Sequence, residues 1–437
     1  MIPAGVALTL LFVASVIFLP RRLAALAVIA SACYITQGQM VIVGGFHMYS
    51  LRIVLLAALI RLKCRGEFKD LKLNKIDWAL LGYAVAVNLV PVLRQGTSIE
   101  MIYRMGCIYD ILLSYWVFRG LIKKWEELET FLTGLAFLIV PMALEMIFEL
   151  VTHKSLFEPF GGIGELTIRE GRPRCQGAFR IGITAGVFGA ALIPMFMSLY
   201  RFKGRSFAAT VGLFAAIVIT YTSNSSGPLM AALSSFVAWM FWPMRTMMKK
   251  VRWGIVLFLI FLHLSMKVPV WFIFSKLGSL TGGDGWHRSY LIDQFIHFFP
   301  DWWLLGAKST SNWMPTVLAN GSADITDFYV AAGVNGGLIS LVLLILILVR
   351  CFSFLGLAMR EHRLHSSDAE VLLWGLGGAL FSHVVTLFSV TYWDQLFVVL
   401  WACLAIISSV TADTLEQKSV AEPPQSDQEL PLNEDED

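Results

Sequence analysis

The feature that most constrains this chain is its series of long apolar segments. A helix that crosses the ~30 Å hydrocarbon core of a bilayer needs ~20 mostly apolar residues. Charged residues make up only 15% of the chain, against roughly a quarter in soluble proteins. Because only helices and closed barrels satisfy backbone polar groups in lipid, uninterrupted apolar runs predict helices. We therefore expect an all-α polytopic membrane protein with about twelve to thirteen transmembrane helices, at 2–20, 23–43, 45–62, 76–93, 101–119, 128–152, 181–200, 206–222, 228–244, 253–274, 326–349, 370–389 and 392–410.

The basic residues of the connecting loops set the expected orientation, because cytoplasmic loops are enriched in Lys and Arg. One alternating set of loops carries nineteen basic residues, and the other carries nine, five of them in 153–180. The first set, which includes 61–75, is therefore expected to be cytoplasmic. The chain then divides into a single transmembrane domain at 1–410 and an acidic, disordered cytoplasmic tail at 411–437. The side of the N-terminus depends on whether both of the first two segments cross.

Two loops on the extracytoplasmic side are long, 153–180 and 275–325. Structureless loops beyond ~12–15 residues are uncommon in compact proteins unless they are functional or disordered. Apolar residues recur at helical spacing between 290 and 299, which predicts an amphipathic helix in the headgroup region. Trp302 and Trp303 follow it as an expected aromatic anchor at the interface. We expect both loops to carry function.

Several arginines are expected at the level of the outer leaflet. Arg172, Arg174 and Arg180 lie close together just before an apolar run. A guanidinium binds phosphate oxygens in a bidentate manner, so these residues favour an anionic ligand. The alternative is pairing with the glutamates of the same loop and with lipid headgroups. Charges inside a membrane tend to face a cavity or a partner, and substrate binding is also predicted for three residues in the outer third of predicted spans: Arg52, Arg104 and Lys267.

Candidate general bases lie in and after the second long loop. His287 and His297 titrate near neutral pH, although a loop histidine is also a common surface residue. Asp327 precedes an apolar run, where it would serve equally well as the N-terminal cap of a helix. The six cysteines are scattered without C-x-x-C spacing, so neither a disulfide framework nor a zinc site is expected. No metal or cofactor is predicted, and a net charge of +3 without a long basic run predicts no nucleic-acid partner.

Four short motifs, in order along the chain, resemble those of the O-antigen ligase and polymerase superfamily. "RCQGAF" (174–179) matches the R-x-x-G-x-F pattern that starts a central span, and "YTSNSSG" (221–227) stands where the family shows T-x-S-R-G. The stretch from Arg288 to Gly306 has the family's spacing between an arginine and L-L-G-x-G. "TDFYVAAGVNGGL" (326–338) is similar to the family's H-N-x-Y-L followed by E-x-G-L. The resemblance covers nearly the whole chain.

The resemblance implies a substrate, an oligosaccharide linked through a diphosphate to a polyprenyl lipid on the outer face of the bacterial inner membrane. Proteins of this family transfer the glycan to an acceptor hydroxyl without a nucleotide sugar or an essential metal. Arg174 and Arg288 would hold the lipid diphosphate, which is the leaving group. Asp327 or His297 would then take the proton of the incoming hydroxyl.

Two departures from the family pattern bear on the expected reaction. Thr326 stands where ligases have a histidine, and Ser226 stands where the family has an arginine. Both favour a polysaccharide polymerase, acting alone or beside a chain-length regulator, over an O-antigen ligase that transfers glycan to a lipid acceptor. A lipid-linked glycan flippase or transporter is the alternative from another class, although the internal repeats common in transporters are not visible.

Overall fold

The computed structural model describes residues 1–437 except 70, 163, 170, 282–283, 320 and 422–437. The fold is all-α, 74% helical, with two small antiparallel hairpins, β1 (Met40–Val43) with β2 (Phe46–Tyr49) and β3 (Ile168–Arg169) with β4 (Arg172–Pro173). Three short 3-10 helices are η1 (Glu158–Phe160), η2 (Trp242–Met247) and η3 (Val270–Phe272). The α-helices are α1 (Pro3–Phe18), α2 (Arg21–Tyr34), α3 (Ser50–Cys64), α4 (Lys75–Gln95), α5 (Ser98–Leu121), α6 (Trp125–Leu138), α7 (Val140–Thr152), α8 (Gly182–Leu199), α9 (Ser206–Thr222), α10 (Ser226–Met240), α11 (Met248–Ser265), α12 (Ile273–Thr281), α13 (Gly285–His297), α14 (Phe299–Trp302), α15 (Phe328–His365), α16 (Ser367–Leu387) and α17 (Asp394–Ala421).

The prediction of a multi-pass helical membrane protein is confirmed. Within the described residues, six spans are long and apolar enough to cross a membrane, and the bent pair Trp242–Ser265 and Val270–Lys276 would add a seventh. Three further apolar helices, α1, α9 and α10, are shorter. The expected number of crossings is larger than six or seven because several expected runs form short helices, such as the 15-residue α3, or carry many charges, as α5 does.

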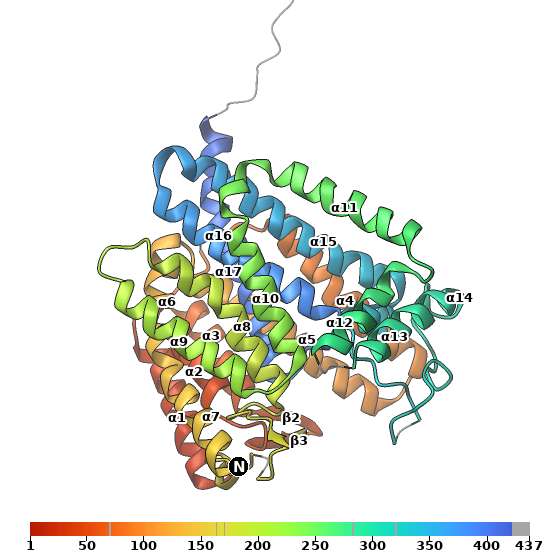
Figure 1. Ribbon diagram of the computed structural model, residues 1–437. Helices are drawn as coiled ribbons and strands as arrows, with labels where there is room; N and C mark the ends of the chain where they lie inside the picture. The colour runs from red at the N-terminus through yellow and green to blue at the C-terminus, as the bar shows by residue number, and fades with distance from the viewer. Residues whose placement is uncertain (70, 163, 170, 282–283, 320, 422–437) are drawn as a thin grey trace, which may run out of the picture.

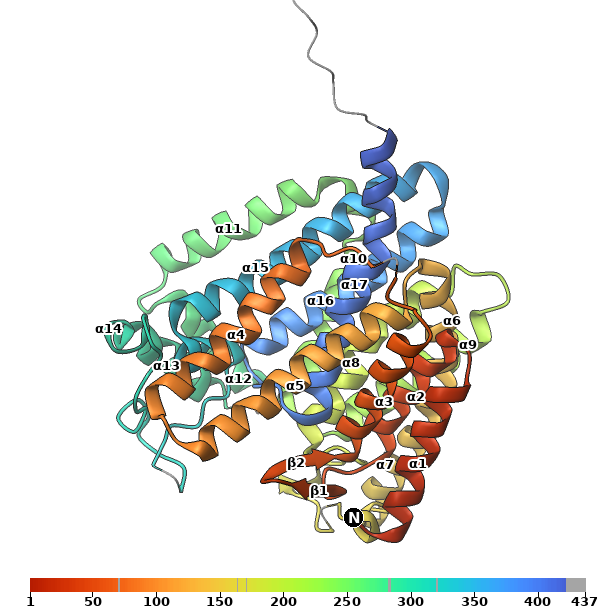
Figure 2. The ribbon, with the colours of Figure 1, turned by 180° about the vertical axis from the view of Figure 1, so that it is seen from behind.

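The N-terminus and the last described turn of α17 lie at opposite ends of the helical bundle. The N-terminus, β2 and β3 share one end, which we call the hairpin end, and α17 emerges at the other (Figures 1 and 2). This arrangement agrees with the predicted alternation, which places 153–180 and the tail on opposite sides of the membrane. The predicted disordered tail begins too early at 411, because α17 continues to Ala421. Residues 422–437 lie outside the described residues.

Residues 40–49 form a β-hairpin where the sequence predicts the spans 23–43 and 45–62. Gly44 and Gly45 have φ angles of 58° and 82°, which a two-residue primed turn requires and glycine adopts without steric cost. The β-branched and aromatic residues on either side favour strands. The two expected spans are therefore too long, because residues 40–49 form two strands and a turn directly before α3.

The helices α8 and α17 form the centre of the bundle, with 89% of the apolar segment of each buried. The sequence of α8 is rich in small residues, which lets neighbouring backbones approach closely. A Cβ atom added at Gly186 would lie 2.3 Å from Ser223 Oγ and 2.6 Å from Pro228 Cγ. The close approach holds the turn between α9 and α10 against the start of α8, at the hairpin end.

The long loop 275–325 has a small hydrophobic core of its own. The predicted amphipathic helix is present as α13, and its buried Leu291 and Phe295 belong to this core. Trp302 is only 2% exposed, and its ring stacks on Phe295 with centroids 3.9 Å apart. Its expected role as an interfacial anchor is therefore wrong, because it packs inside the loop, whereas Trp303 is exposed.

The helix α11 lies at the edge of the bundle (Figure 2). None of its described residues is buried. The expected span 253–274 is interrupted after Ser265, where the chain bends by 93°. Pro269 fixes its own φ and restricts the residue before it, so the helix cannot continue through this point. Lys267 lies in the bend and is exposed, so its predicted place inside a span is wrong.

Candidate functional site

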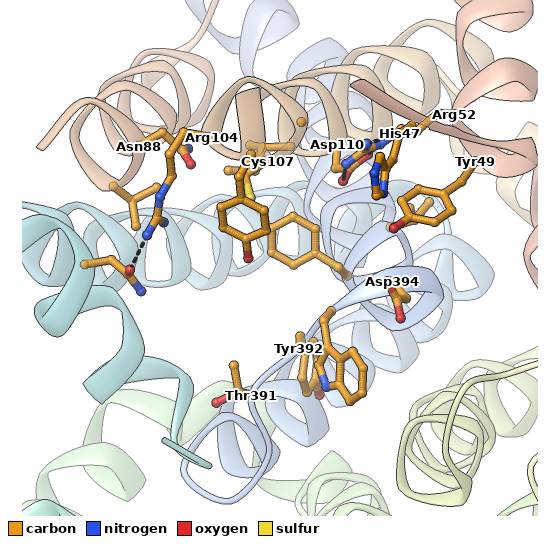
Figure 3. A pocket seen from close by; sticks show the side chains of 18 of the residues that line it. His47, Tyr49, Arg52, Asn88, Arg104, Cys107, Asp110, Thr391, Tyr392 and Asp394 are labelled. Atoms are coloured by element: carbon orange, nitrogen blue, oxygen red, sulfur yellow. Dashed lines mark hydrogen bonds and ion pairs between the residues drawn. The ribbon is translucent and has the colours of Figure 1, made fainter. Parts of the chain in front are cut away.

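A first cavity of about 680 Å³ opens at the hairpin end of the bundle. Three of the arginines predicted to bind substrate, Arg52, Arg104 and Arg180, line it. Figure 3 shows Arg104 at one end of the cavity, the Arg52–Asp110 pair at the other, and Asp394 on the facing wall. These three come from α3, α5 and the loop before α8, so segments far apart in the sequence contribute arginines to one cavity.

Arg52 lies on the first turn of α3 and is neutralised by Asp110 of α5. Its Nε donates to Asp110 Oδ1 at 2.7 Å and its Nη2 to Oδ2 at 2.5 Å. Its Nη1 donates to the backbone oxygen of His47 at 2.6 Å. The rings of Phe46 and Tyr49 lie 5.0 and 5.1 Å from the guanidinium carbon. Because both carboxylate oxygens are engaged, this pair forms a fixed wall of the cavity rather than a free charge.

Arg104 and Arg180 also have acidic partners. Arg104 Nε donates to Glu100 Oε1 at 2.6 Å, one helical turn away, and its Nη2 donates to Asn335 Oδ1 at 2.7 Å. Arg180 Nη1 lies 3.6 Å from Asp394 Oδ2. Each predicted arginine of the first cavity is therefore accompanied by a carboxylate.

The remaining lining combines aliphatic residues such as Ile99, Ile102 and Val398 with aromatic and uncharged polar side chains, among them Tyr49, Tyr83, Asn88, Tyr103, Asn335, Thr391, Tyr392 and Trp393. Trp393 lies under the Arg180 guanidinium, 4.8 Å from ring centroid to carbon. Aromatic rings present flat apolar faces, while Tyr hydroxyls and the amides supply hydrogen bonds at their edges. The cavity thus suits a polar, ring-shaped ligand with little charge.

A second cavity, of about 700 Å³, lies beside the turn between α9 and α10. Arg169 and Arg172 line it, together with Ser225 and Ser226 at the start of α10. Arg169 and Arg172 are direct partners across the β3–β4 hairpin. Like charges placed directly opposite each other on two strands repel. The second cavity therefore has a concentration of positive charge that an anion would relieve.

Arg174 and Arg288, the pair expected to hold the diphosphate, line neither cavity, but both lie near Arg169 of the second cavity. Arg174 Nε donates to Ser225 Oγ at 2.9 Å, and its Nη2 donates to the same oxygen. Burial lowers the pKa of Arg174, and the charge of Arg169 lowers it further. Burial also lowers the pKa of Arg288, against the effect of Asp284, and Arg169 again contributes to the decrease. The expectation that Arg52, Arg104, Arg174 and Arg288 share one cavity is corrected, since they divide between two regions.

Within the described residues, neither Arg174 nor Arg288 forms an ion pair. Arg172 forms none either with the described glutamates of the loop, Glu158 and Glu165. Arginine stays protonated at any accessible pH, so these side chains keep their charges despite the lowered pKa values. An anion that entered the second cavity would meet Arg172, which no described carboxylate neutralises.

The segment 174–180 connects the two cavities. Glu149 Oε2 accepts hydrogen bonds from the backbone N–H groups of Gln176 at 2.7 Å and Gly177 at 3.1 Å. Gln395 at the start of α17 donates its side-chain N–H to the backbone oxygen of Ala178 at 2.9 Å. The chain thus passes in a fixed path from Arg174 at the second cavity to Arg180 at the first.

The candidate bases lie elsewhere. Asp327 is 1% exposed, and its Oδ1 accepts a hydrogen bond from Val330 N at 2.9 Å, which makes it the N-cap of α15. His297 is exposed, with its ring against Phe298 at a centroid distance of 5.0 Å. His287 Nε2 lies 2.9 Å from the backbone oxygen of Asp324. None of the three lines either cavity.

Asp394 is the site residue that the sequence reasoning missed. It lines the first cavity beside Arg180. The signal was an aspartate within the expected span 392–410, since a charged residue inside a predicted span favours a cavity or a partner.

Comparison with known proteins leaves the family open: no protein-family model matches this chain, and no curated protein matches it. In the part of the chain that the structure describes, no group of three or more metal-ligating side chains is found. The fold and the cavities define a multi-pass helical membrane protein with two polar cavities at one end of the bundle.

Proposed function

We propose that the protein is a polysaccharide polymerase that joins oligosaccharide repeat units carried on polyprenyl diphosphate, on the outer face of the bacterial inner membrane. The observation that carries the proposal is the pair of cavities at the two ends of the segment 174–180, one lined by two neighbouring arginines and one lined in part by aromatic and amide groups. A lipid-linked glycan has the same two parts, an anionic diphosphate and an uncharged polar glycan.

The second cavity supports the diphosphate part of the proposal. Arg169 and Arg172 line this cavity together with the N-terminus of α10, and Arg174 donates to Ser225 at the same helix start. Ser225 at the N-cap position makes no capping hydrogen bond, because its oxygen accepts from Arg174 instead. Free N–H groups at a helix N-terminus favour anions. The apolar Leu229 and Phe236, which line the same cavity, suit the start of a prenyl chain.

The first cavity supports the glycan part. Sugar rings have apolar faces that stack on aromatic rings and hydroxyls that need donors and acceptors. Tyr49, Tyr103 and Trp393 supply rings, and Asn88 and Asn335 supply amides. At about 680 Å³ the cavity lies within the usual range for ligand sites.

The proposed chemistry is displacement of the diphosphate by a sugar hydroxyl. Negative charge develops on the diphosphate oxygen as the glycosidic bond breaks. Fixed cations aimed at this charge stabilise the transition state more than the ground state. In this proposal Arg174 and Arg288 perform that role, and the arginines of the first cavity order the glycan through their neutral, hydrogen-bonded pairs.

The deciding experiment supplies a purified lipid-diphosphate repeat unit to the purified protein in liposomes. A ladder of products that lengthen by one repeat unit is the expected result. A single transfer to an added lipid acceptor would indicate a ligase, and movement of the lipid across the bilayer without bond formation would indicate a flippase. Addition of a chain-length regulator should change the length of the ladder and not its existence.

A further inference from the structure

We propose that Asp394 is the general base that takes the proton from the attacking sugar hydroxyl. This inference rests on the proposed function, and it assigns a role that neither Asp327 nor His297 can take from where they lie. Asp394 is the first residue of α17 and lines the first cavity. Six residues, 388–393, separate it from the end of α16.

The backbone holds the Asp394 carboxylate in an unusual place. Its φ is 51°, in the left-handed region that few residues other than glycine, asparagine and aspartate adopt. The residues that follow belong to the buried α17, and Gln395 is tied to Ala178. Non-glycine residues in this region cluster at functional sites, where the surrounding structure maintains the strain.

The carboxylate retains its capacity to accept a proton. Two carboxylates line the first cavity, Asp110 and Asp394. Both oxygens of Asp110 accept hydrogen bonds from Arg52. In Asp394, Oδ2 is buried beside Arg180 Nη1 at 3.6 Å, and the side chain as a whole stays 21% exposed, with no bidentate partner within the described residues. Asp394 is therefore the lining carboxylate that can bind an incoming hydroxyl.

Charged groups from three other elements face Asp394. Arg180 of the segment 174–180 lies 3.6 Å from its Oδ2, and Arg52 of α3 and Asp110 of α5 line the same cavity. The hairpin contributes His47 and Tyr49 to the same cavity. An ionised carboxylate with one nearby guanidinium, held short of a bidentate pair, is the form that a base requires.

The transfer step balances as follows. A hydroxyl oxygen of the acceptor glycan forms a bond to the anomeric carbon of the donor glycan, and the bond from that carbon to the diphosphate oxygen breaks. The electron pair of the broken bond leaves with the diphosphate, beside Arg174. The hydroxyl proton passes to the Asp394 carboxylate and from there to water. For both groups to act on one bond, the donor glycan must extend from Arg174 along the segment 174–180 to the cavity wall at Arg180 and Asp394.

The test uses Asp394→Asn, which preserves shape and tolerates a positive φ. Removing a general base lowers the rate by about a hundred- to ten-thousandfold, so we expect a loss of this size in ladder formation in liposomes, with donor binding unchanged. The wild-type rate should fall as the pH drops through the titration of the carboxyl group, and the residual rate of Asp394→Asn should not. Asp301→Asn is the matched control, at an exposed aspartate that lines neither cavity, and it should stay near the wild-type rate.

A second variant keeps the test decisive if Asp394→Asn folds poorly. Glycine suits φ 51°, so Asp394→Gly should fold and leave room for a small carboxylate. Added formate should restore part of its activity, which a purely structural role of Asp394 would not allow. A near-wild-type Asp394→Asn, or a fall in Asp301→Asn equal to that in Asp394→Asn, would overturn the role of Asp394 alone. Absence of transfer by the wild type would overturn the proposed function and this role with it.

Discussion

The two cavities use the same residue type in opposite ways. In the first cavity, Arg52, Arg104 and Arg180 each have a carboxylate within 3.6 Å. In the second region, Arg174 and Arg288 have no ion pair within the described residues. Neutralised arginines order neighbouring side chains and leave the cavity nearly uncharged, whereas unneutralised arginines store a charge that only a ligand can balance. The number of arginines therefore does not by itself locate an anion site. What matters is whether each arginine already has a carboxylate partner.

The largest expected effect is a complete difference in cysteine labelling between the two ends of the molecule. Cys64 is an exposed residue in the predicted cytoplasmic loop 61–75. In a Cys107→Ser background, a membrane-impermeant maleimide should leave Cys64 unlabelled in intact cells and label it after permeabilisation. Ile168→Cys, in the arginine-rich loop, should show the reverse. Labelling of Cys64 in intact cells would place both cavities on the cytoplasmic side.

The next largest effect concerns stability. Arg52→Ala leaves Asp110 without its cation, and breaking a buried ion pair costs about 3–5 kcal/mol. We expect the lower end of this range, because the Asp110 side chain is 25% exposed. Arg174→Ala removes no carboxylate partner and should cost only about 1 kcal/mol for its hydrogen bond. Thermal unfolding in detergent measures both, and equal losses would contradict the contrast between the two regions.

The two unneutralised arginines should show a loss of rate rather than of stability. Lysine keeps the charge but not the planar fork, so Arg174→Lys and Arg288→Lys each lose a charge-assisted hydrogen bond in the transition state. A bond of this kind contributes ~1.5–3 kcal/mol, which corresponds to a rate loss of about ten- to a hundredfold. Polymer yield at matched membrane levels measures the effect.

Arg201→Lys, at an exposed arginine of a predicted cytoplasmic loop, is the matched control and should leave the yield unchanged. Near-wild-type polymer from both Arg174→Lys and Arg288→Lys would show that the two arginines supply only a diffuse positive field.

The smallest effect should come from weakening the attachment of the segment 174–180, which lies between the two cavities. Gln395→Ala removes the hydrogen bond to Ala178, for which we expect a cost of about 1 kcal/mol. Backbone hydrogen exchange in 174–180 should become faster, while exchange in α8 stays as in the wild type. Unchanged exchange in 174–180 would mean that Glu149 alone holds the segment.

The fold class and part of the site were predictable because they depend on local sequence. Long apolar runs in a chain with few charges predict membrane helices, and charges within those runs predict a cavity. Arg52 and Arg104 were located in this way. The hairpin at 40–49 was missed because hydropathy does not distinguish an apolar strand from an apolar helix, although the pair Gly44-Gly45 was visible as a turn signal.

The partners of the arginines could not be predicted, because they come from distant segments. Asp110 lies 58 residues from Arg52, and Asp394 lies on a different helix from the loop of Arg180. The division into two cavities follows from this pairing. The exposed position of His297 and the capping role of Asp327 depend in the same way on how the long loop folds onto α15.

The isolation of α11 has a consequence for the way in which the sequence of this protein can change over time. Its side chains meet the surrounding solvent on every face, so one apolar residue should substitute for another with little penalty. In α8 a single methyl group at Gly186 would collide with Ser223 and Pro228. The two helices have similar apolar content, yet α11 should drift freely among lineages while α8 keeps its small residues, and saturation mutagenesis of both would measure the difference.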